Sequence, residues 1–236
     1  MSQSSGRLGK VKRALLRHET TDILREGILS NQFAPEDALV ERELAAEMGV
    51  SRTAVREALI KLEAQGLVTS VPHKGWSVAR LTPRDIWEIY TLRSLLEGFA
   101  ARLVTERATG ENLDKLDRIV GEMRTAVERG DRRALSELDF AFHEQLCELS
   151  GHSRLLKLWY TQAWQFKRYM AVLNFEYPEI EAVAETHVPI LQAIRSGDPD
   201  RAQATVTRAI EEFGKGIAEI VRALQVEVTP GTAGED

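Results

Sequence analysis

The sequence predicts a mostly α-helical protein: a small N-terminal domain of three helices and a β-hairpin, followed by an antiparallel all-α helical bundle. Two observations carry this prediction. Apolar residues recur at helical spacing through most of the chain. β-Prone runs occur together only once, in LVTSV and WSVAR around the Pro/Gly turn PHKG. A length of 236 residues leaves room for two such domains.

Composition excludes several classes of protein. Hydrophobic residues make up 43% and charged residues 28% of the chain, as in ordinary globular proteins. No apolar run approaches the roughly 20 residues that span a bilayer, and the N-terminus lacks the apolar core of a signal peptide. Cys147 is the single cysteine, which rules out an internal disulfide and a CxxC zinc motif. We therefore expect a cytoplasmic protein.

Charge is unevenly distributed along the chain, whose formal net charge is −5. Residues 1–80 hold 12 Lys and Arg against 10 Asp and Glu, whereas residues 81–236 hold 19 against 26. This asymmetry is a weak indication that the N-terminal part meets a polyanion.

The N-terminal elements follow from local signals. Residues 1–10 are polar and Gly/Ser-rich, which predicts a disordered arm. A helix is expected over 11–30, until NQFAPED interrupts it. A short helix over 41–48 ends at Gly49, a typical helix C-terminus.

A third helix begins after the capping residue Ser51, runs to about Gln65 and ends at Gly66. Its apolar stripe is Val55, Leu59 and Leu62.

The bundle begins at LTPRD, where Thr82 can cap a helix, Pro83 suits the first helical position and Asp85 follows three residues after the cap. From there, the patterns predict helices over approximately 83–108, 111–129, 131–149, 152–174, 178–196 and 199–224. The domains are thus expected at 11–80 and 81–224, with a disordered tail at 225–236.

Helix, helix, tight turn, helix and hairpin is the order of a winged helix-turn-helix, in which the second helix of the pair enters the DNA major groove. Its opening turn here carries Arg52, Thr53 and Arg56. Cations at a helix N-terminus oppose the helix dipole. An external anion such as DNA phosphate would offset that cost.

The stretch LVERELAAEMGVSRTAVREALIKLEAQGLV…HKGWSV resembles the DNA-binding domain of GntR-family bacterial transcription regulators, although that family usually has Pro where Ala54 stands. The following segments LRSLLEGFAARL, LDFAFHEQLCELSGHSRL and ETHVPILQAIRSGD resemble the FCD effector domain of the FadR-type subfamily. The resemblance implies DNA contacts from Arg42, Ser51, Arg52, Thr53, Arg56, His73, Lys74 and Gly75.

The alternative is that these residues are solvated charges on a scaffold of helices. That alternative is strongest for single residues such as Lys61 and Lys74.

Polar residues interrupt two apolar stripes of the bundle. Asp139 and His143 fall at i and i+4 on a stripe with Leu135 and Leu146, and His187 interrupts a second stripe. A buried carboxylate is costly unless it is paired or bound to metal. Two ligands one helical turn apart can hold one cation. The alternative is a hydrogen-bonded Asp139–His143 pair, with His187 as a satisfied core histidine.

The resemblance adds a reason for this pattern, because many FCD domains bind a divalent metal with one Asp and three His inside the bundle. Asp139, His143 and His187 match three of these positions, and Ala209 stands where the fourth His is expected. Three ligands can hold zinc, nickel or manganese with open positions for water or an acid. A member without metal is the other outcome. His152 is expected to cap a helix and not to bind metal.

Arg93 shares a stripe with Ile86, Ile89 and Leu96, and Glu97 follows at i+4. One interpretation is an internal Arg93–Glu97 ion pair. The other is a cation that faces a cavity and binds the carboxylate of an effector, since Arg binds carboxylates in a forked geometry.

The sequence therefore favours a homodimeric transcription regulator, in this family usually a repressor, that binds an inverted-repeat operator and responds to a small organic acid. The alternative is a metal-dependent helical enzyme that uses Asp139, His143 and His187, with Glu144 as the nearest candidate base. A third interpretation is a non-specific DNA-packaging protein, but the net negative charge of the helical bundle argues against it.

Overall fold

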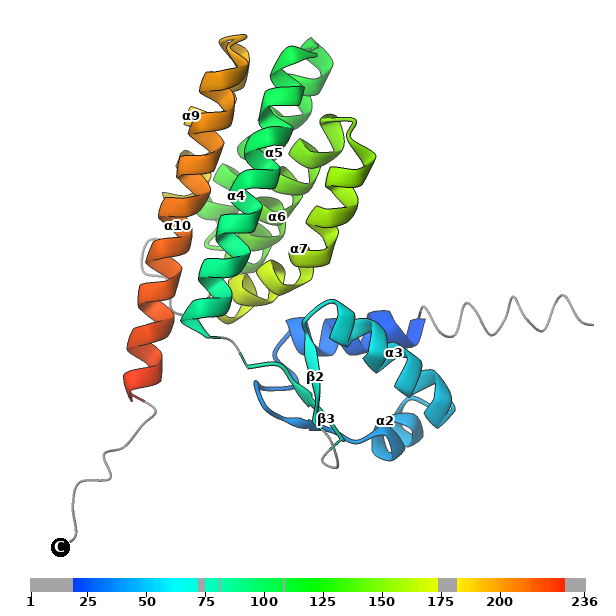
Figure 1. Cartoon of the computed structure of the whole chain (residues 1–236). Coiled ribbons are helices and arrows are strands. Elements are labelled where there is room, and N and C mark those ends of the chain that lie inside the picture. The colour runs from blue at the N-terminus through cyan, green and yellow to red at the C-terminus, as the bar shows by residue number, and fades with distance from the viewer. Residues whose placement is uncertain (1–18, 72–74, 81, 108, 174–181, 228–236) are drawn as a thin grey trace, which may run out of the picture. The chain divides into compact units, whose positions relative to one another are not determined.

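A computed structural model describes residues 19–71, 75–80, 82–107, 109–173 and 182–227 (Figure 1). The chain forms two compact units, one up to Arg80 and one from Leu81. The expected disordered arm at 1–10, most of the expected tail, His73 and Lys74 lie outside the described residues.

The first unit is a helical domain with a small sheet. Residues 19–29 are helical and are followed along the chain by five elements. These are β1 (Ala38–Leu39), α2 (Glu41–Glu47), α3 (Arg52–Ala64), β2 (Val68–Val71) and β3 (Gly75–Val78). The sheet order is β1-β3-β2 and both pairings are antiparallel. The predicted hairpin is β2 and β3. The third strand, β1, was missed because two residues are too few to show an alternating pattern.

The turn between α2 and α3 forms as the sequence predicts. Gly49 has a φ of +64°, which glycine adopts without steric cost. The Ser51 hydroxyl accepts a hydrogen bond from the Ala54 backbone N–H and caps α3. Val55 and Leu59 are fully buried, so the opposite face of α3 remains in solvent.

The second unit is all helical. It contains α4 (Pro83–Glu106), α5 (Gly110–Glu128), α6 (Arg132–Leu149), α7 (Ser153–Leu173), α8 (Val183–Thr186), α9 (Val188–Arg195) and α10 (Pro199–Glu227). The start of α4 is the predicted capping box: Thr82 and Asp85 each bind the other's backbone N–H. The core of the second unit includes the buried aromatic residues Phe142, Trp159 and Phe166.

The single helix predicted over 178–196 is wrong in its described part, because two helices, α8 and α9, meet at His187. Pro189 stands in the first turn of α9. Proline has no N–H to donate to the preceding turn, so the helical ladder cannot continue unbroken across it. His187 therefore lies at a helix junction and not in mid-helix.

Helices α4 and α10 lie side by side and form the most extensive contact in the second unit (Figure 1). Two glycines allow this close approach. A Cβ added at Gly98 would overlap the Thr207 hydroxyl, and one added at Gly214 would lie 2.6 Å from Cβ of Tyr90. Both glycines are in helices, where glycine has a poor intrinsic propensity, so packing and not local preference explains them.

Gly214→Ala should therefore lower the unfolding free energy of the second unit, although alanine is the better helix former. The tyrosine beneath it must shift out of a packed core, which typically costs about 1–3 kcal/mol. Gly121→Ala in α5 is the matched control, because an added Cβ there meets nothing within 4 Å. The control should gain about 0.5–1 kcal/mol. Denaturant unfolding measures both. A stabilised Gly214→Ala variant would contradict the close packing of α4 and α10.

Candidate functional site

The first candidate surface is the start of α3. Ser51, Arg52, Thr53 and Arg56 are all exposed there, as expected of side chains that reach into a groove. Within the described part of the chain, Arg52 makes no ion pair, so its guanidinium is available to a ligand. Arg42 on α2 is also exposed and contacts Glu43 at 3.6 Å. Gly75, at the described edge of the wing, is exposed with a φ of +87°.

Glu41 organises this surface, and the sequence analysis did not single it out. Its Oε1 accepts hydrogen bonds from Nε of Arg56 at 3.0 Å and from the indole N–H of Trp76 at 3.1 Å. One carboxylate thus ties α2 to α3 and to β3 of the wing. Arg56 is held in this ion pair although its side chain is 66% exposed, whereas Arg52 is not paired. We infer different roles for the two arginines.

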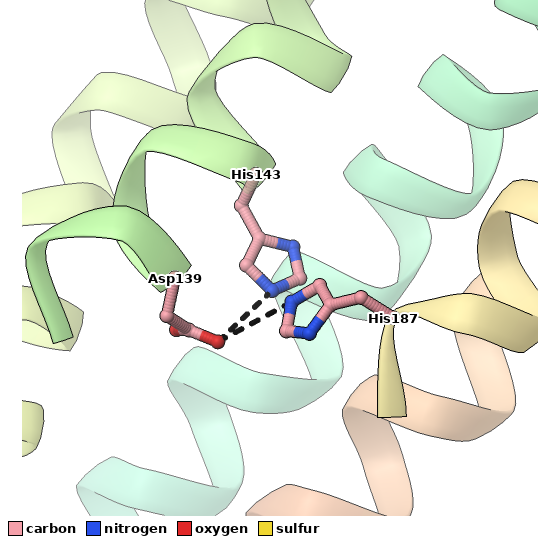
Figure 2. A group of neighbouring side chains, drawn as sticks. All are labelled: Asp139, His143 and His187. Atoms are coloured by element: carbon pink, nitrogen blue, oxygen red, sulfur yellow. Dashed lines mark ion pairs between the residues drawn. The ribbon is translucent and has the colours of Figure 1, made fainter. Parts of the chain in front are cut away.

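The second candidate site is the polar cluster in the bundle, which brings together all three residues predicted as metal ligands. Asp139 and His143 come from successive turns of α6, and His187 comes from the α8–α9 junction (Figure 2). All three are buried. Oδ1 of Asp139 lies 3.3 Å from Nε2 of His187 and 3.9 Å from Nε2 of His143. The three ligand atoms lie within 4.8 Å of one another.

In each of the two histidines, the contact made by Nδ1 determines whether Nε2 carries the proton. Nδ1 of His187 lies 2.8 Å from the Val183 carbonyl oxygen, which can only accept, so Nδ1 carries the proton. Nδ1 of His143 lies 2.5 Å from Oε2 of Glu97 without the alignment of a hydrogen bond, and this distance is too short for two unprotonated acceptors, so we place the proton on Nδ1 here as well. In the neutral rings, both Nε2 atoms therefore present lone pairs to the Asp139 carboxylate.

Three acceptor atoms that converge without a donor repel one another, and Nε2 of His187 has no hydrogen-bond partner. A cation among them removes the conflict, and it can be an added imidazole proton or a metal ion. The separations of 3.3 and 3.9 Å lie below the roughly 4.2 Å that two ligands can span across one zinc ion. The donor set of two imidazoles and one carboxylate thus fits a divalent metal.

A buried charge network surrounds the cluster. Glu97 is fully buried, and its Oε1 accepts hydrogen bonds from Nε of Arg93 and from the indole N–H of Trp159, each at 2.8 Å. The predicted Arg93–Glu97 ion pair thus forms. Burial alone would raise the pKa of Glu97, but the Arg93 guanidinium and the adjacent His143 imidazole outweigh it and hold this pKa far below its usual range.

Asp139 behaves in the same way. Burial would raise its pKa, but the imidazoles of His187 and His143 and the guanidinium of Arg93 lower it below the usual value. Both buried carboxyl groups are therefore ionised at neutral pH, as metal ligation and ion pairing require.

The cluster lies on the wall of a cavity of about 740 Å³. Arg93 also lines this cavity, and its Nη2 has no hydrogen-bond partner. Both interpretations of Arg93 are therefore compatible, because one edge of the guanidinium holds Glu97 while Nη2 stays free. Ala209 lines the same cavity, so the side where a fourth protein ligand was expected is open. Two further cations, Arg201 and Arg208 of α10, line it as well.

His152 and Glu144 do not belong to the cluster of Asp139, His143 and His187. Nδ1 of His152 accepts a hydrogen bond from the Leu155 N–H at the start of α7, which is a cap and not a metal contact. Glu144 accepts a hydrogen bond from the Tyr160 hydroxyl at 2.7 Å and is absent from the cavity wall.

Both units of the chain match known protein families. Residues 16–78 match the model of the gntR family of bacterial regulatory proteins, and residues 88–212 match the FCD domain. The chain belongs to the GntR family and carries an FCD domain. It is a DNA-binding transcription regulator. The enzyme alternative is thereby excluded, since the family and its named relatives are regulators.

The curated relatives cover most of the chain. One is a probable D-xylose utilization operon transcriptional repressor from Paenarthrobacter nicotinovorans, 31% identical over 73% of this chain and 76% of that protein. Another is the Nta operon transcriptional regulator of Aminobacter aminovorans, 30% identical over 85% of this chain and 93% of that protein.

Solved structures show the same fold. Escherichia coli McbR/YncC superposes with a TM-score of 0.73 at 21% identity, over 89% of this chain and 98% of that one. A GntR regulator from Rhodococcus sp. RHA1 gives a TM-score of 0.69 at 21% identity, over 88% of this chain and 98% of that one.

In the present chain, every described helix is too short or too polar to cross a bilayer.

Proposed function

We propose that this regulator is a homodimeric repressor whose operator binding is controlled by a small organic acid, bound beside a divalent metal in the helical domain. The observation that carries the proposal is the convergence of three candidate ligand atoms, one from a carboxylate and two from imidazoles, on a cavity that also contains cations. In this proposal residues 11–80 bind DNA in the cytoplasm and residues 81–224 bind the effector and the second subunit.

We propose a metal ion because a single proton cannot relieve the repulsion among all three acceptor atoms. A proton on Nε2 of His187 would satisfy that nitrogen and Asp139 but would leave His143 directed at the same carboxylate. One ion contacts all three ligands at once. Zinc, nickel and manganese each accept this donor set. When bound, the metal supplies positive charge and a coordination position for an acid ligand.

The organic acid is proposed from the other groups on the cavity wall. Arg93 offers a free Nη2, and Arg201 and Arg208 form no ion pair with another described residue. A carboxylate is the anion that forked guanidinium groups bind best among common metabolites without phosphate. The absence of a side chain beyond Cβ at Ala209 leaves room for that carboxylate near the three ligands.

An effector in this cavity contacts parts of α4, α6, α9 and α10 at the same time. Helix α4 follows directly after the DNA-binding unit in the chain. An acid that binds one arrangement of these helices better than another shifts the population toward it. This is the route by which the effector would change the spacing of two DNA-binding units.

Dimerisation is supported by an apolar stripe on the outer face of α4. Trp87 and Leu95 are 62% and 67% exposed, and Leu92 and Phe99 are also exposed. Contiguous apolar residues of this size on a soluble chain typically mark an interaction surface. A two-fold dimer would present two α3 helices to an inverted repeat.

Arg52→Ala should weaken operator binding by about 1–3 kcal/mol, because an unpaired arginine at the start of α3 can bind guanine or phosphate. Titration of a labelled operator measures the loss, and single base-pair changes show whether preference at one position relaxes. Arg84→Ala is the control, since that exposed arginine lies on α4 and pairs with Glu88. Equal binding by Arg52→Ala and the wild type would contradict the assignment of α3 to the groove.

Leu95→Glu should convert the dimer to a monomer at micromolar concentration, because it places a charge in the middle of the apolar stripe. Sedimentation velocity gives the mass. Ile23→Glu changes another exposed apolar residue, in the first unit, and should remain dimeric. A monomeric wild type would refute dimerisation, and a dimeric Leu95→Glu variant would refute this face.

His187→Ala should abolish metal retention and the release of DNA by effector, while operator binding without effector persists. The variant loses one of the three ligands but touches nothing in the first unit. Elemental analysis and operator titration are the two measurements, and His152→Ala should behave as wild type. If the wild-type protein holds no zinc, nickel or manganese after incubation with each, the cluster is a protonated polar network and the metal proposal fails.

A further inference from the structure

We propose that Glu97 is the positioning residue of this centre: its carboxylate holds the proton of His143 on Nδ1 and so keeps the Nε2 lone pair directed at the metal position. The inference rests on the proposed metal site but concerns a residue outside the ligand set. The same carboxylate holds Arg93 at the cavity wall, so that one side chain sets both the metal ligand and the effector cation.

The geometry assigns a separate task to each oxygen of Glu97. Oε1 already accepts from Arg93 and from Trp159, both at 2.8 Å. Oε2 is the atom that lies 2.5 Å from Nδ1 of His143. Glu97 is fully buried, so the two hydrogen bonds to Oε1 and the close contact of Oε2 with His143 fix the orientation of its carboxylate. The carboxylate cannot rotate to serve one donor without losing another.

The tautomer of His143 depends on this contact. A neutral imidazole carries one proton, and the nitrogen that faces a carboxylate keeps it. Nδ1 faces Glu97, so Nε2 is left without a proton and points toward Asp139 and His187. In His187, the Val183 carbonyl keeps the proton on Nδ1 in the same way. A metal-binding histidine commonly depends on such an outer partner, and loss of the partner typically weakens metal binding by about 10–100-fold.

Glu97→Gln is the informative substitution because it keeps size and removes one acceptor. The amide oxygen is retained by the two donors Arg93 and Trp159, so the amide NH₂ replaces Oε2 opposite His143. Nδ1 must then accept a hydrogen bond, and the proton moves to Nε2. A protonated Nε2 cannot ligate a metal. The variant should therefore lose zinc affinity by about 10–100-fold.

Trp159→Phe is the matched control. It removes a hydrogen bond to the same carboxylate and perturbs the same core, but it leaves Oε2 and His143 in contact. Its zinc affinity should stay within about threefold of the wild type, even if both variants unfold at lower denaturant concentration. This pair separates a positioning role from general damage to the core.

Two readouts test the proposal on the full-length dimer. Competition with a chromophoric chelator gives the zinc dissociation constants. Long-range ¹H–¹⁵N spectra of the metal-free protein at pH 8 report the His143 tautomer, expected with the proton on Nδ1 in the wild type and on Nε2 in Glu97→Gln. An unchanged tautomer in Glu97→Gln, or an equal loss of zinc affinity in Trp159→Phe, would overturn the proposal. If the wild type binds no zinc, the metal proposal fails and the tautomer spectra alone decide the role of Glu97.

Discussion

The second unit depends on one constraint: the charges that it buries beside its cavity must be balanced within the bundle. Two carboxylates, two guanidinium groups and two imidazoles are buried among apolar helices, and one of these guanidinium groups, that of Arg168, has no hydrogen-bond partner among the described residues on either terminal nitrogen. Breaking a buried pair by removing one partner typically costs about 3–5 kcal/mol, so the partners of each buried charge matter for stability. Here Oε1 of Glu97 has two hydrogen-bond donors, whereas Nε2 of His187 and Nη2 of Arg93 have no hydrogen-bond partner. Both of these groups line the cavity, and this is why we assign a function to this part of the cluster.

The fold supplies the geometry that this network needs. Asp139 and His143 share one face of α6 because they are one helical turn apart. His187 reaches them from a helix junction, where its backbone N–H bonds the Ala184 carbonyl and leaves the Val183 carbonyl available to the ring. The close packing of α4 and α10 at Gly98 and Gly214 sets the position of the wall opposite. In the first unit, Glu41 has a comparable part, since one carboxylate ties the recognition helix to the wing.

Much of this architecture could be predicted because it depends on local signals. Capping at Ser51 and Thr82, the glycine turn after α2 and the apolar stripes located the helices within a few residues. The cluster of Asp139, His143 and His187 was predicted from polar residues on apolar stripes together with the family pattern. Local signals failed at β1, which is too short to have a pattern, and at the α8–α9 junction, where a helical stripe continues across a proline. Glu97 was seen only as the partner of Arg93, because its contact with His143 joins helices whose packing no local pattern reveals.

The central claim is that the three converging acceptors are metal ligands, and X-ray absorption spectroscopy of the zinc-loaded protein tests it most directly. We expect a first shell of nitrogen and oxygen near 2.0–2.1 Å, with the outer-shell scattering of two imidazole rings. Zinc that cannot be loaded, or that shows a sulfur neighbour near 2.3 Å from the sole thiol, Cys147, would contradict it.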